Sequence, residues 1–152
     1  MNYIGKWIFH SIGGMDENDK LVYLSAEEYL KSPMPYIDET DEEEVANELR
    51  ERKGQIGMQL KICDDGKLYM LMPLPEGVTQ EEVDAAVNAG VIKLMDGMLV
   101  DAPKAWEDRG GEFWYDTGIE GEAFGEKTDT WVKASDENGF INIFTARFTK
   151  SI

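Results

Sequence analysis

Alternation of apolar and polar positions predicts short strands over much of the chain. In segment 56–63 the apolar side chains fall at every second position, which is the period of a strand with one buried face. These side chains are Ile56, Met58, Leu60 and Ile62. Residues 3–12 are rich in β-branched and aromatic side chains and end at Gly13-Gly14, so they predict a first strand.

Four dipeptides typical of tight turns between antiparallel strands recur along the chain. They are Asp65-Gly66, Asp96-Gly97, Gly110-Gly111 and Asn138-Gly139. Hairpin signals without alternation of strands and helices favour an antiparallel meander. Roughly nine or ten strands in one layer tend to curl and close, because closure removes exposed strand edges. The pattern therefore predicts a mainly β fold, an antiparallel up-and-down β-barrel with two or three short helices.

Three segments carry the signals of those helices. Each begins with a serine or threonine followed three residues later by a glutamate, which is a capping box. The segments are 25–31, 40–53 and 79–89. The second has acidic residues in its first turns, basic residues in its last turn and Gly54 after it, an order that suits the helix dipole. Its thin apolar stripe predicts a position on a surface or across an opening.

Length and charge narrow the class of protein. The chain has 152 residues, and we expect residues 1–152 to form a single domain with a full core. Its 15 basic and 31 acidic residues give a net charge of −16, which disfavours nucleic acid and membrane surfaces as partners. The single cysteine, Cys63, allows no internal disulfide and suits a reducing compartment. Because the sequence shows neither a signal peptide nor a bilayer-spanning apolar run, a cytoplasmic location is expected.

The first and last predicted strands carry residues that mark a known group of barrels. Gly5-Lys6-Trp7 stands at the start of the meander and Arg147 in its final strand. With the hairpin meander, these residues resemble the calycin group, the lipocalins and fatty-acid-binding proteins, and the chain looks like a bacterial lipocalin-like protein. The resemblance implies that Gly5, Trp7 and Arg147 close one end of the barrel, with the guanidinium over the indole ring as a cation–π contact.

The same resemblance bears on the helices and on the closing strand. It implies that segments 25–31 and 40–53 act as a lid, whereas the helix at 79–89 lies outside the usual plan of either family and is a local insertion. Fatty-acid-binding proteins carry Arg-x-Tyr in the closing strand, where it grips a ligand carboxylate. This chain departs from that pattern, with Arg147-Phe148-Thr149.

Methionine and tryptophan side chains are the candidates for a ligand site. Soft thioethers and flat rings suit a cavity that accepts an apolar molecule. The candidates are Met58, Met70, Met72, Trp106, Trp114 and Trp131. The alternative is that these side chains simply fill a small barrel. Trp114 and Tyr115 point to opposite faces of one strand, so at most one of them lines the interior.

Candidate catalytic groups are few. His10 is the only histidine, and we expect it on the strand face shared by Ile8 and Ile12, in the core or at the rim. Carboxylates beside Cys63 are expected to raise the pKa of its thiol, which disfavours a reactive thiolate. The sequence therefore predicts no catalytic residue.

Two further segments have a structural interpretation. The acidic run 38–44 is better explained as a cap on the following helix than as a cation site. The glycine-rich segment 118–127 lacks the context of a phosphate loop and predicts a bent or bulged strand. No metal and no cofactor are predicted.

Three functions are compatible with these patterns. The preferred one is non-enzymatic binding of a small apolar or amphipathic molecule inside a lipocalin-like barrel, with segments 25–31 and 40–53 over one mouth. The second is an interaction module with a solid barrel, whose acidic surface binds a basic protein. The third is an enzyme at the barrel mouth, with His10 or a buried carboxylate as the base.

Overall fold

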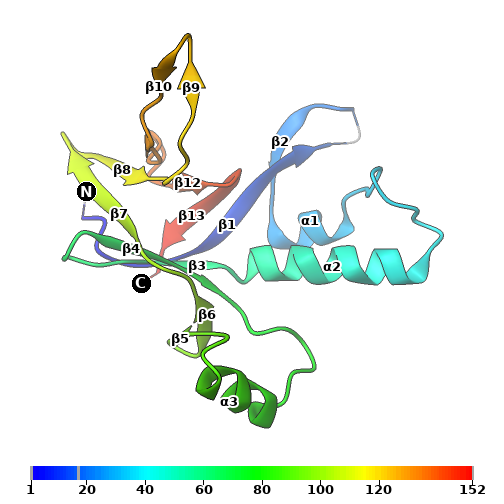
Figure 1. The fold of residues 1–152 in the computed structure, drawn as a ribbon. Coiled ribbons are helices and arrows are strands. Elements are labelled where there is room, and N and C mark those ends of the chain that lie inside the picture. Colours follow the sequence, from blue (N-terminus) through cyan, green and yellow to red (C-terminus); the bar gives the residue numbers. More distant parts are fainter. Residues whose placement is uncertain (1, 17, 152) are drawn as a thin grey trace.

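The structure, a computed structural model, describes residues 2–16 and 18–151 and is mainly β (Figure 1). The described strands are β1 (Gly5–Met15), β2 (Leu21–Leu24), β3 (Gln59–Ile62), β4 (Lys67–Met72), β5 (Leu94–Met95), β6 (Met98–Val100), β7 (Lys104–Arg109), β8 (Glu112–Asp116), β9 (Glu122–Ala123), β10 (Glu126–Lys127), β11 (Trp131–Lys133), β12 (Ile141–Ile143) and β13 (Ala146–Lys150). The helices are α1 (Ala26–Lys31), α2 (Glu42–Ile56) and α3 (Gln80–Asn88).

The main sheet is antiparallel throughout, as the hairpin signals predict. Its strand order is β11-β8-β7-β4-β3-β1-β13-β12, with β2 on β1 and β6 on β4. The sheet curls into a half-barrel. Its two edges approach each other after β11, where the Ala134 amide donates to Phe113 O and the Asn142 amide donates to Ala134 O. Ser135 forms a β-bridge with Ile141 of β12.

The hydrophobic core lies inside the curl and extends along β1 from Trp7 to Ile12. Trp7, Phe113 and Phe148 are its largest fully buried side chains. Indole Nε1 of Trp7 donates to the Tyr3 carbonyl at 2.8 Å, so the one polar atom of the buried ring is satisfied. The Tyr3 hydroxyl in turn donates to Gly111 O at 2.6 Å, which ties the N-terminal segment to the β7–β8 turn.

The three predicted helices are confirmed, with small shifts at their ends. Ser25 and Glu28 form the expected capping box of α1, and Thr79 caps α3. Helix α2 begins one residue later than the predicted cap implies, because Asp41, rather than Thr40, caps it. It also continues past Gly54 to Ile56 and ends at Gly57, where a side chain would collide with the Pro73 ring.

A buried arginine holds the two N-terminal helices together. Arg52 of α2 is almost fully buried, and its guanidinium donates to the carbonyl oxygens of Tyr29, Ser32 and Pro33 at 2.7, 2.9 and 3.1 Å. Its Nε pairs with Glu48 at 3.0 Å. The carbonyl oxygens at the end of α1 therefore find their donors on α2, which fixes the helical pair beside the β1–β2 hairpin (Figure 1).

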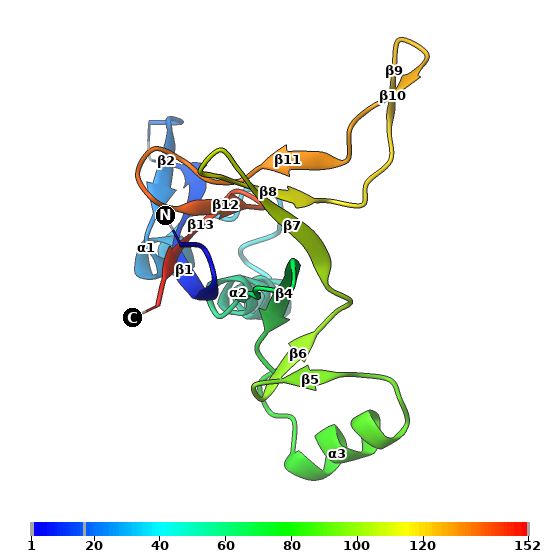
Figure 2. The ribbon, with the colours of Figure 1, turned by 90° about the vertical axis from the view of Figure 1, so that its left-hand side faces the viewer.

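Two hairpins differ from the sequence-based prediction. Segment 118–127, predicted as a bent strand, forms a separate hairpin, β9–β10, that extends away from the half-barrel (Figure 2). Strands β12 and β13 also form a hairpin, with Phe144 and Thr145 at its turn, although these residues carry no turn signal. The segment around Asn138-Gly139 is a turn before β12, as predicted.

We expect Arg52→Met to lower the free energy of unfolding by about 3 kcal/mol, because three carbonyl oxygens and Glu48 lose their partner. Urea denaturation followed by circular dichroism measures this loss. Arg50→Met is the matched control: Arg50 is exposed and bonds only Asn47 among the described residues, so the change stays within about 0.5 kcal/mol. Equal effects of the two substitutions would contradict the role of Arg52.

Candidate functional site

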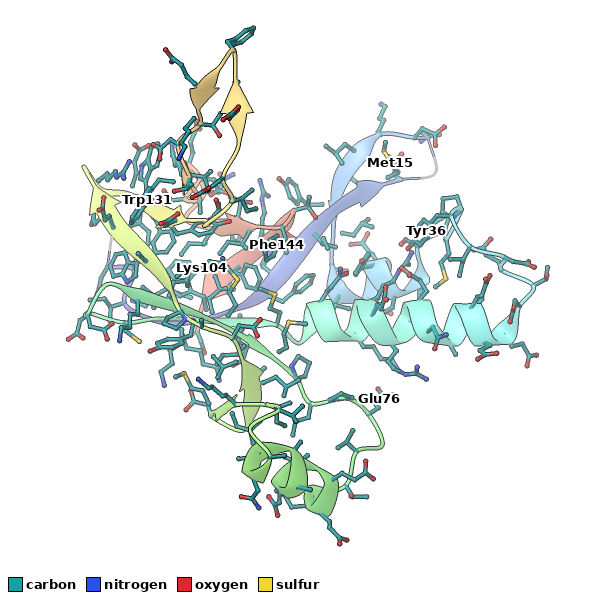
Figure 3. The ribbon with its side chains drawn as sticks, in the orientation of Figure 1. Met15, Tyr36, Glu76, Lys104, Trp131 and Phe144 are labelled. Carbon is teal, nitrogen blue, oxygen red and sulfur yellow. The ribbon has the colours of Figure 1, made fainter. Side chains whose placement is uncertain are left out.

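A cavity of about 530 Å³ opens at one end of the half-barrel and is the best-formed candidate site. Its walls come from the end of α2, from β4, from β1 and β13, from the β12–β13 turn and from the segment that leads into β7 (Figure 3). The lining residues are Ile12, Gln55, Met58, Leu68, Met70, Met72, Asp101, Ala102, Lys104, Ile143, Phe144 and Ala146.

Three of the six predicted ligand-site residues meet in this cavity. Met70 and Met72 lie on the same face of β4 as the fully buried Leu68, because alternate residues of a strand share a face. Met58 precedes β3, which pairs with β4 and so brings its thioether to the same wall. The predicted methionine site is therefore assembled by the β3–β4 hairpin.

The opposite wall consists of smaller side chains. Ile12 of β1 and Ala146 of β13 are cross-strand partners and both face the cavity. Further along the same two strands Trp7 pairs with Lys150, at the packed end of the core. The cavity thus lies at the end of these strands opposite Trp7.

Three polar side chains line the otherwise apolar cavity. Lys104 Nζ donates to Thr117 O at 3.0 Å, which leaves its other two N–H groups available. The Gln55 side chain accepts a hydrogen bond from the Tyr29 hydroxyl through its amide oxygen. Its amide nitrogen adds a hydrogen-bond donor at the cavity wall. Asp101 is exposed. The cavity therefore offers an apolar body with a cation, an amide and a carboxylate at its border.

The three predicted tryptophans do not line this cavity. Trp106 lies on the inner face, stacked on Phe113 at 5.4 Å, and its Nε1 donates to Cys63 O at 2.8 Å. Trp114 and Trp131 lie on the other face, where the Arg109 guanidinium covers both indoles at 4.8 and 5.0 Å. Tyr115 is the buried member of the Trp114-Tyr115 pair, so the predicted split between faces is confirmed.

Gly5 and Trp7 lie at the end of the half-barrel where β1 pairs with β3. Gly5 has a φ of +137°, a region that favours glycine, and a Cβ there would approach Lys150 Cε to 3.1 Å. Trp7 is fully buried. The N-terminal strand therefore enters the core through a position that only glycine suits.

The predicted contact between Arg147 and Trp7 is wrong. Arg147 alternates with the fully buried Phe148, so its side chain leaves β13 on the outer face. There its guanidinium lies 3.6 Å from the centre of the Tyr23 ring and 5.2 Å from that of Phe140. Its Nε is 3.6 Å from Asp136 Oδ2.

Asp136 organises the turn that precedes β12. Its carboxylate accepts hydrogen bonds from the amides of Asn138 and Phe140 and from Asn142 Nδ2. Burial alone would raise the pKa of Asp136, but these hydrogen bonds and the nearby Arg147 outweigh it and lower the pKa.

His10 and Cys63 lie outside the cavity. The His10 ring packs on Phe140 at 4.4 Å, and its Nδ1 is 3.0 Å from Ser11 Oγ. A register shift between Phe9 and Ser11 breaks the alternation of β1, so His10 does not share a face with both Ile8 and Ile12 as predicted. Burial, and to a smaller extent the Asp65 carboxylate, raises the pKa of the Cys63 thiol, in the predicted direction.

The acidic run 38–44 serves the start of α2, as predicted. Asp41 accepts from the amides of Glu43 and Glu44, and the Glu44 carboxylate accepts from the Asp38 amide. Within residues 2–16 and 18–151, no three His, Cys, Asp or Glu side chains are placed to hold a metal ion. None of the described helices is long and apolar enough to cross a membrane.

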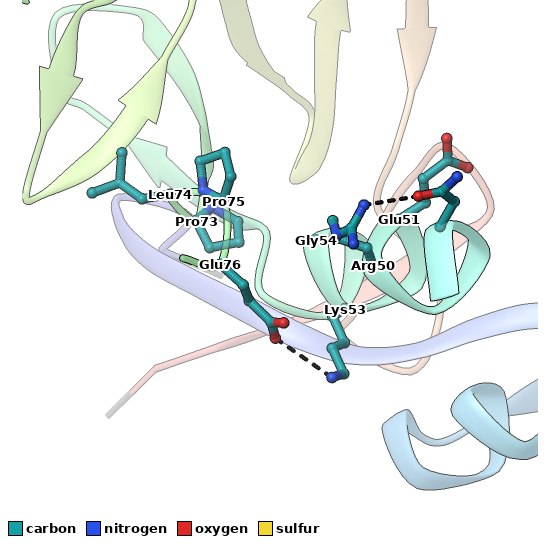
Figure 4. A pocket seen from close by; sticks show the side chains of 9 residues that line it. Arg50, Glu51, Lys53, Gly54, Pro73, Leu74, Pro75 and Glu76 are labelled. Carbon is teal, nitrogen blue, oxygen red and sulfur yellow. Dashed lines mark hydrogen bonds and ion pairs between the residues drawn. The ribbon is translucent and has the colours of Figure 1, made fainter. Parts of the chain in front are cut away.

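A second cleft, of about 570 Å³, lies between α2 and the segment that follows β4 (Figure 4). Its apolar side is Pro73, Leu74 and Pro75, and an ion pair of 3.4 Å between Lys53 and Glu76 spans it. Both partners of that pair are largely exposed. The cleft is more open than the methionine cavity, so it is the weaker candidate.

Comparisons with protein-family models, with curated proteins and with solved structures gave no match to this chain. The functional argument therefore depends on the geometry of the cavity.

We expect Asp136→Asn to lower stability near neutral pH by about 1 kcal/mol and to flatten its dependence on acid pH. A carboxyl group with a lowered pKa stabilises the fold above its ordinary pKa, and this contribution is lost as pH falls through the lowered value. The difference between wild type and variant should therefore shrink as pH falls below the ordinary aspartate pKa of about 3.9. Urea denaturation at a series of pH values measures it, and a constant difference would contradict the assignment.

Proposed function

We propose that this chain is a binding protein for a small apolar or amphipathic molecule, held in the methionine cavity without chemical conversion. The observation that carries the proposal is the cavity itself, which has a volume of about 530 Å³ and lies at the end of the half-barrel opposite Trp7. This volume falls in the range of roughly 300–1,000 Å³ that is typical of small-molecule sites. The interaction-module alternative requires a solid interior, so the cavity favours the binding proposal over that alternative.

The lining indicates the chemistry of the ligand. Met58, Met70 and Met72 are flexible and polarizable, so they adapt to an apolar body of irregular shape. Lys104 and Gln55 supply hydrogen-bond donors at the border of the cavity. A molecule with an apolar body and one polar end matches this arrangement best.

The fold supports a lipocalin-like assignment within the same proposal. Gly5-Lys6-Trp7 enters the packed end of an antiparallel, curled sheet, and the end of α2 borders the opposite, open end. We propose that the half-barrel corresponds to a calycin barrel whose lid is α1 and α2, and that the protein acts in the cytoplasm. His10 lies against Phe140 rather than in the cavity, and Asp101, the carboxylate at the cavity border, is exposed. The enzymatic alternative, which calls for His10 or a buried carboxylate as the base, is therefore the less supported one.

We expect the native protein to bind anilinonaphthalene sulfonate at a single saturable site from which decanol displaces it. Met70→Trp fills the cavity and should weaken this binding by about tenfold or more. Met15→Trp is the matched control, because Met15 is exposed at the tip of the β1–β2 hairpin, away from the cavity (Figure 3). Its affinity should equal that of the wild type, as fluorescence titration measures.

Two results would overturn the proposal. The first is wild-type fluorescence that rises without saturation or resists decanol. The second is equal affinity of Met70→Trp and Met15→Trp, which would place the dye elsewhere on the surface. Thermal unfolding of each variant shows whether a loss of binding reflects a loss of the fold.

A further inference from the structure

The turn between β12 and β13 has an unusual backbone for its sequence. Ile143 and Ala146 form the last pair of the hairpin, so Phe144 and Thr145 are its two turn residues. Their φ angles are +53° and +70°. Turns with two left-handed residues strongly prefer Asn-Gly, and a bulky or β-branched side chain in this region is an outlier. The hairpin therefore holds a conformation that its residues disfavour.

Burial of the Phe144 ring contributes little to the stability of the fold. The residue is 66% exposed although it is aromatic, so burial in the core does not offset the backbone strain. Phe144 is nevertheless one of the residues that line the methionine cavity, as are Ile143 and Ala146. Strain that persists at the border of a binding site is characteristic of residues that contact a ligand.

We propose that Phe144 is a specificity-determining residue of the cavity, whose ring covers the bound molecule and selects ligands with an apolar surface at the mouth. This inference rests on the binding function proposed above. In the empty protein the ring meets water, whereas a ligand in the cavity removes both apolar surfaces from solvent. Under this proposal the Phe144 ring, which is exposed in the free protein, becomes buried when the ligand binds.

The chain contains its own control for this argument. Phe124, at the tip of the β9–β10 hairpin, has a φ of +54° and is fully exposed. It therefore shares the backbone strain and the exposure of Phe144, but it does not line the cavity. Asparagine tolerates the left-handed region, so the same replacement relieves strain at both positions.

The test compares Phe144→Asn with Phe124→Asn. Both variants should unfold at a temperature about 2–4 °C higher than the wild type, because both lose a strained phenylalanine. Only Phe144→Asn should bind anilinonaphthalene sulfonate more weakly, by about tenfold, which is the scale expected for losing a covering aromatic ring. In stopped-flow measurements its dissociation rate should rise by about the same factor, with little change in the association rate. Phe144→Tyr keeps the ring and should keep wild-type affinity.

The possible outcomes distinguish a failure of the proposed role of Phe144 from a failure of the proposed binding function. If the wild type binds the dye and Phe144→Asn binds it equally well, the role of Phe144 is wrong and the cavity remains the site. If Phe124→Asn weakens binding as much as Phe144→Asn, the effect is not specific to the cavity and the role of Phe144 is again wrong. If the wild type shows no saturable site, the binding function and the role of Phe144 fail together.

Discussion

The burial of Trp7 is the constraint on which the rest of the structure depends. Its ring is fully enclosed, and its Nε1 has the Tyr3 carbonyl as acceptor, so the first residues of the chain must fold back against the start of β1. A buried indole N–H without an acceptor would be costly, which makes this arrangement specific. Because Trp7 pairs with both Leu60 and Lys150, the same position sets the registers of β3 and β13. The packed end of the half-barrel thus follows from one side chain.

The open end follows from the same registers. Along β1 and β13 the cross-strand pairs run from Trp7–Lys150 through Phe9–Phe148 to Ile12–Ala146. Ile12 and Ala146 are buried core residues that also line the cavity, so the cavity lies directly against this end of the core. Under the proposed function, ligand binding would use the end of these strands opposite Trp7.

The sequence predicted this organisation where local signals were strong. Alternation predicted a strand for Leu60 and Ile62, which lie in β3, and Asp65-Gly66 brought Met70 back beside them. The same alternation was wrong for Ile56, which ends α2, and for Met58, which precedes β3. It could not predict Phe144-Thr145 as a turn, because that turn opposes the preference of its own residues. It also could not tell on which face each tryptophan lies, since only the folded sheet decides that Trp106 points in and that Trp114 and Trp131 point out.

Arg147, which was predicted to contact Trp7, instead supports the cavity wall from the outer face of the sheet. Arg147 lies between Tyr23 and Phe140 on the outside of the strands whose inner side forms the cavity wall. A guanidinium between two rings restrains β2, β13 and the segment before β12 from behind. Ile12 and Ala146 are therefore held by contacts that do not enter the cavity. For the proposed binding function, this means that the cavity wall is supported from outside and not by side chains that fill the cavity.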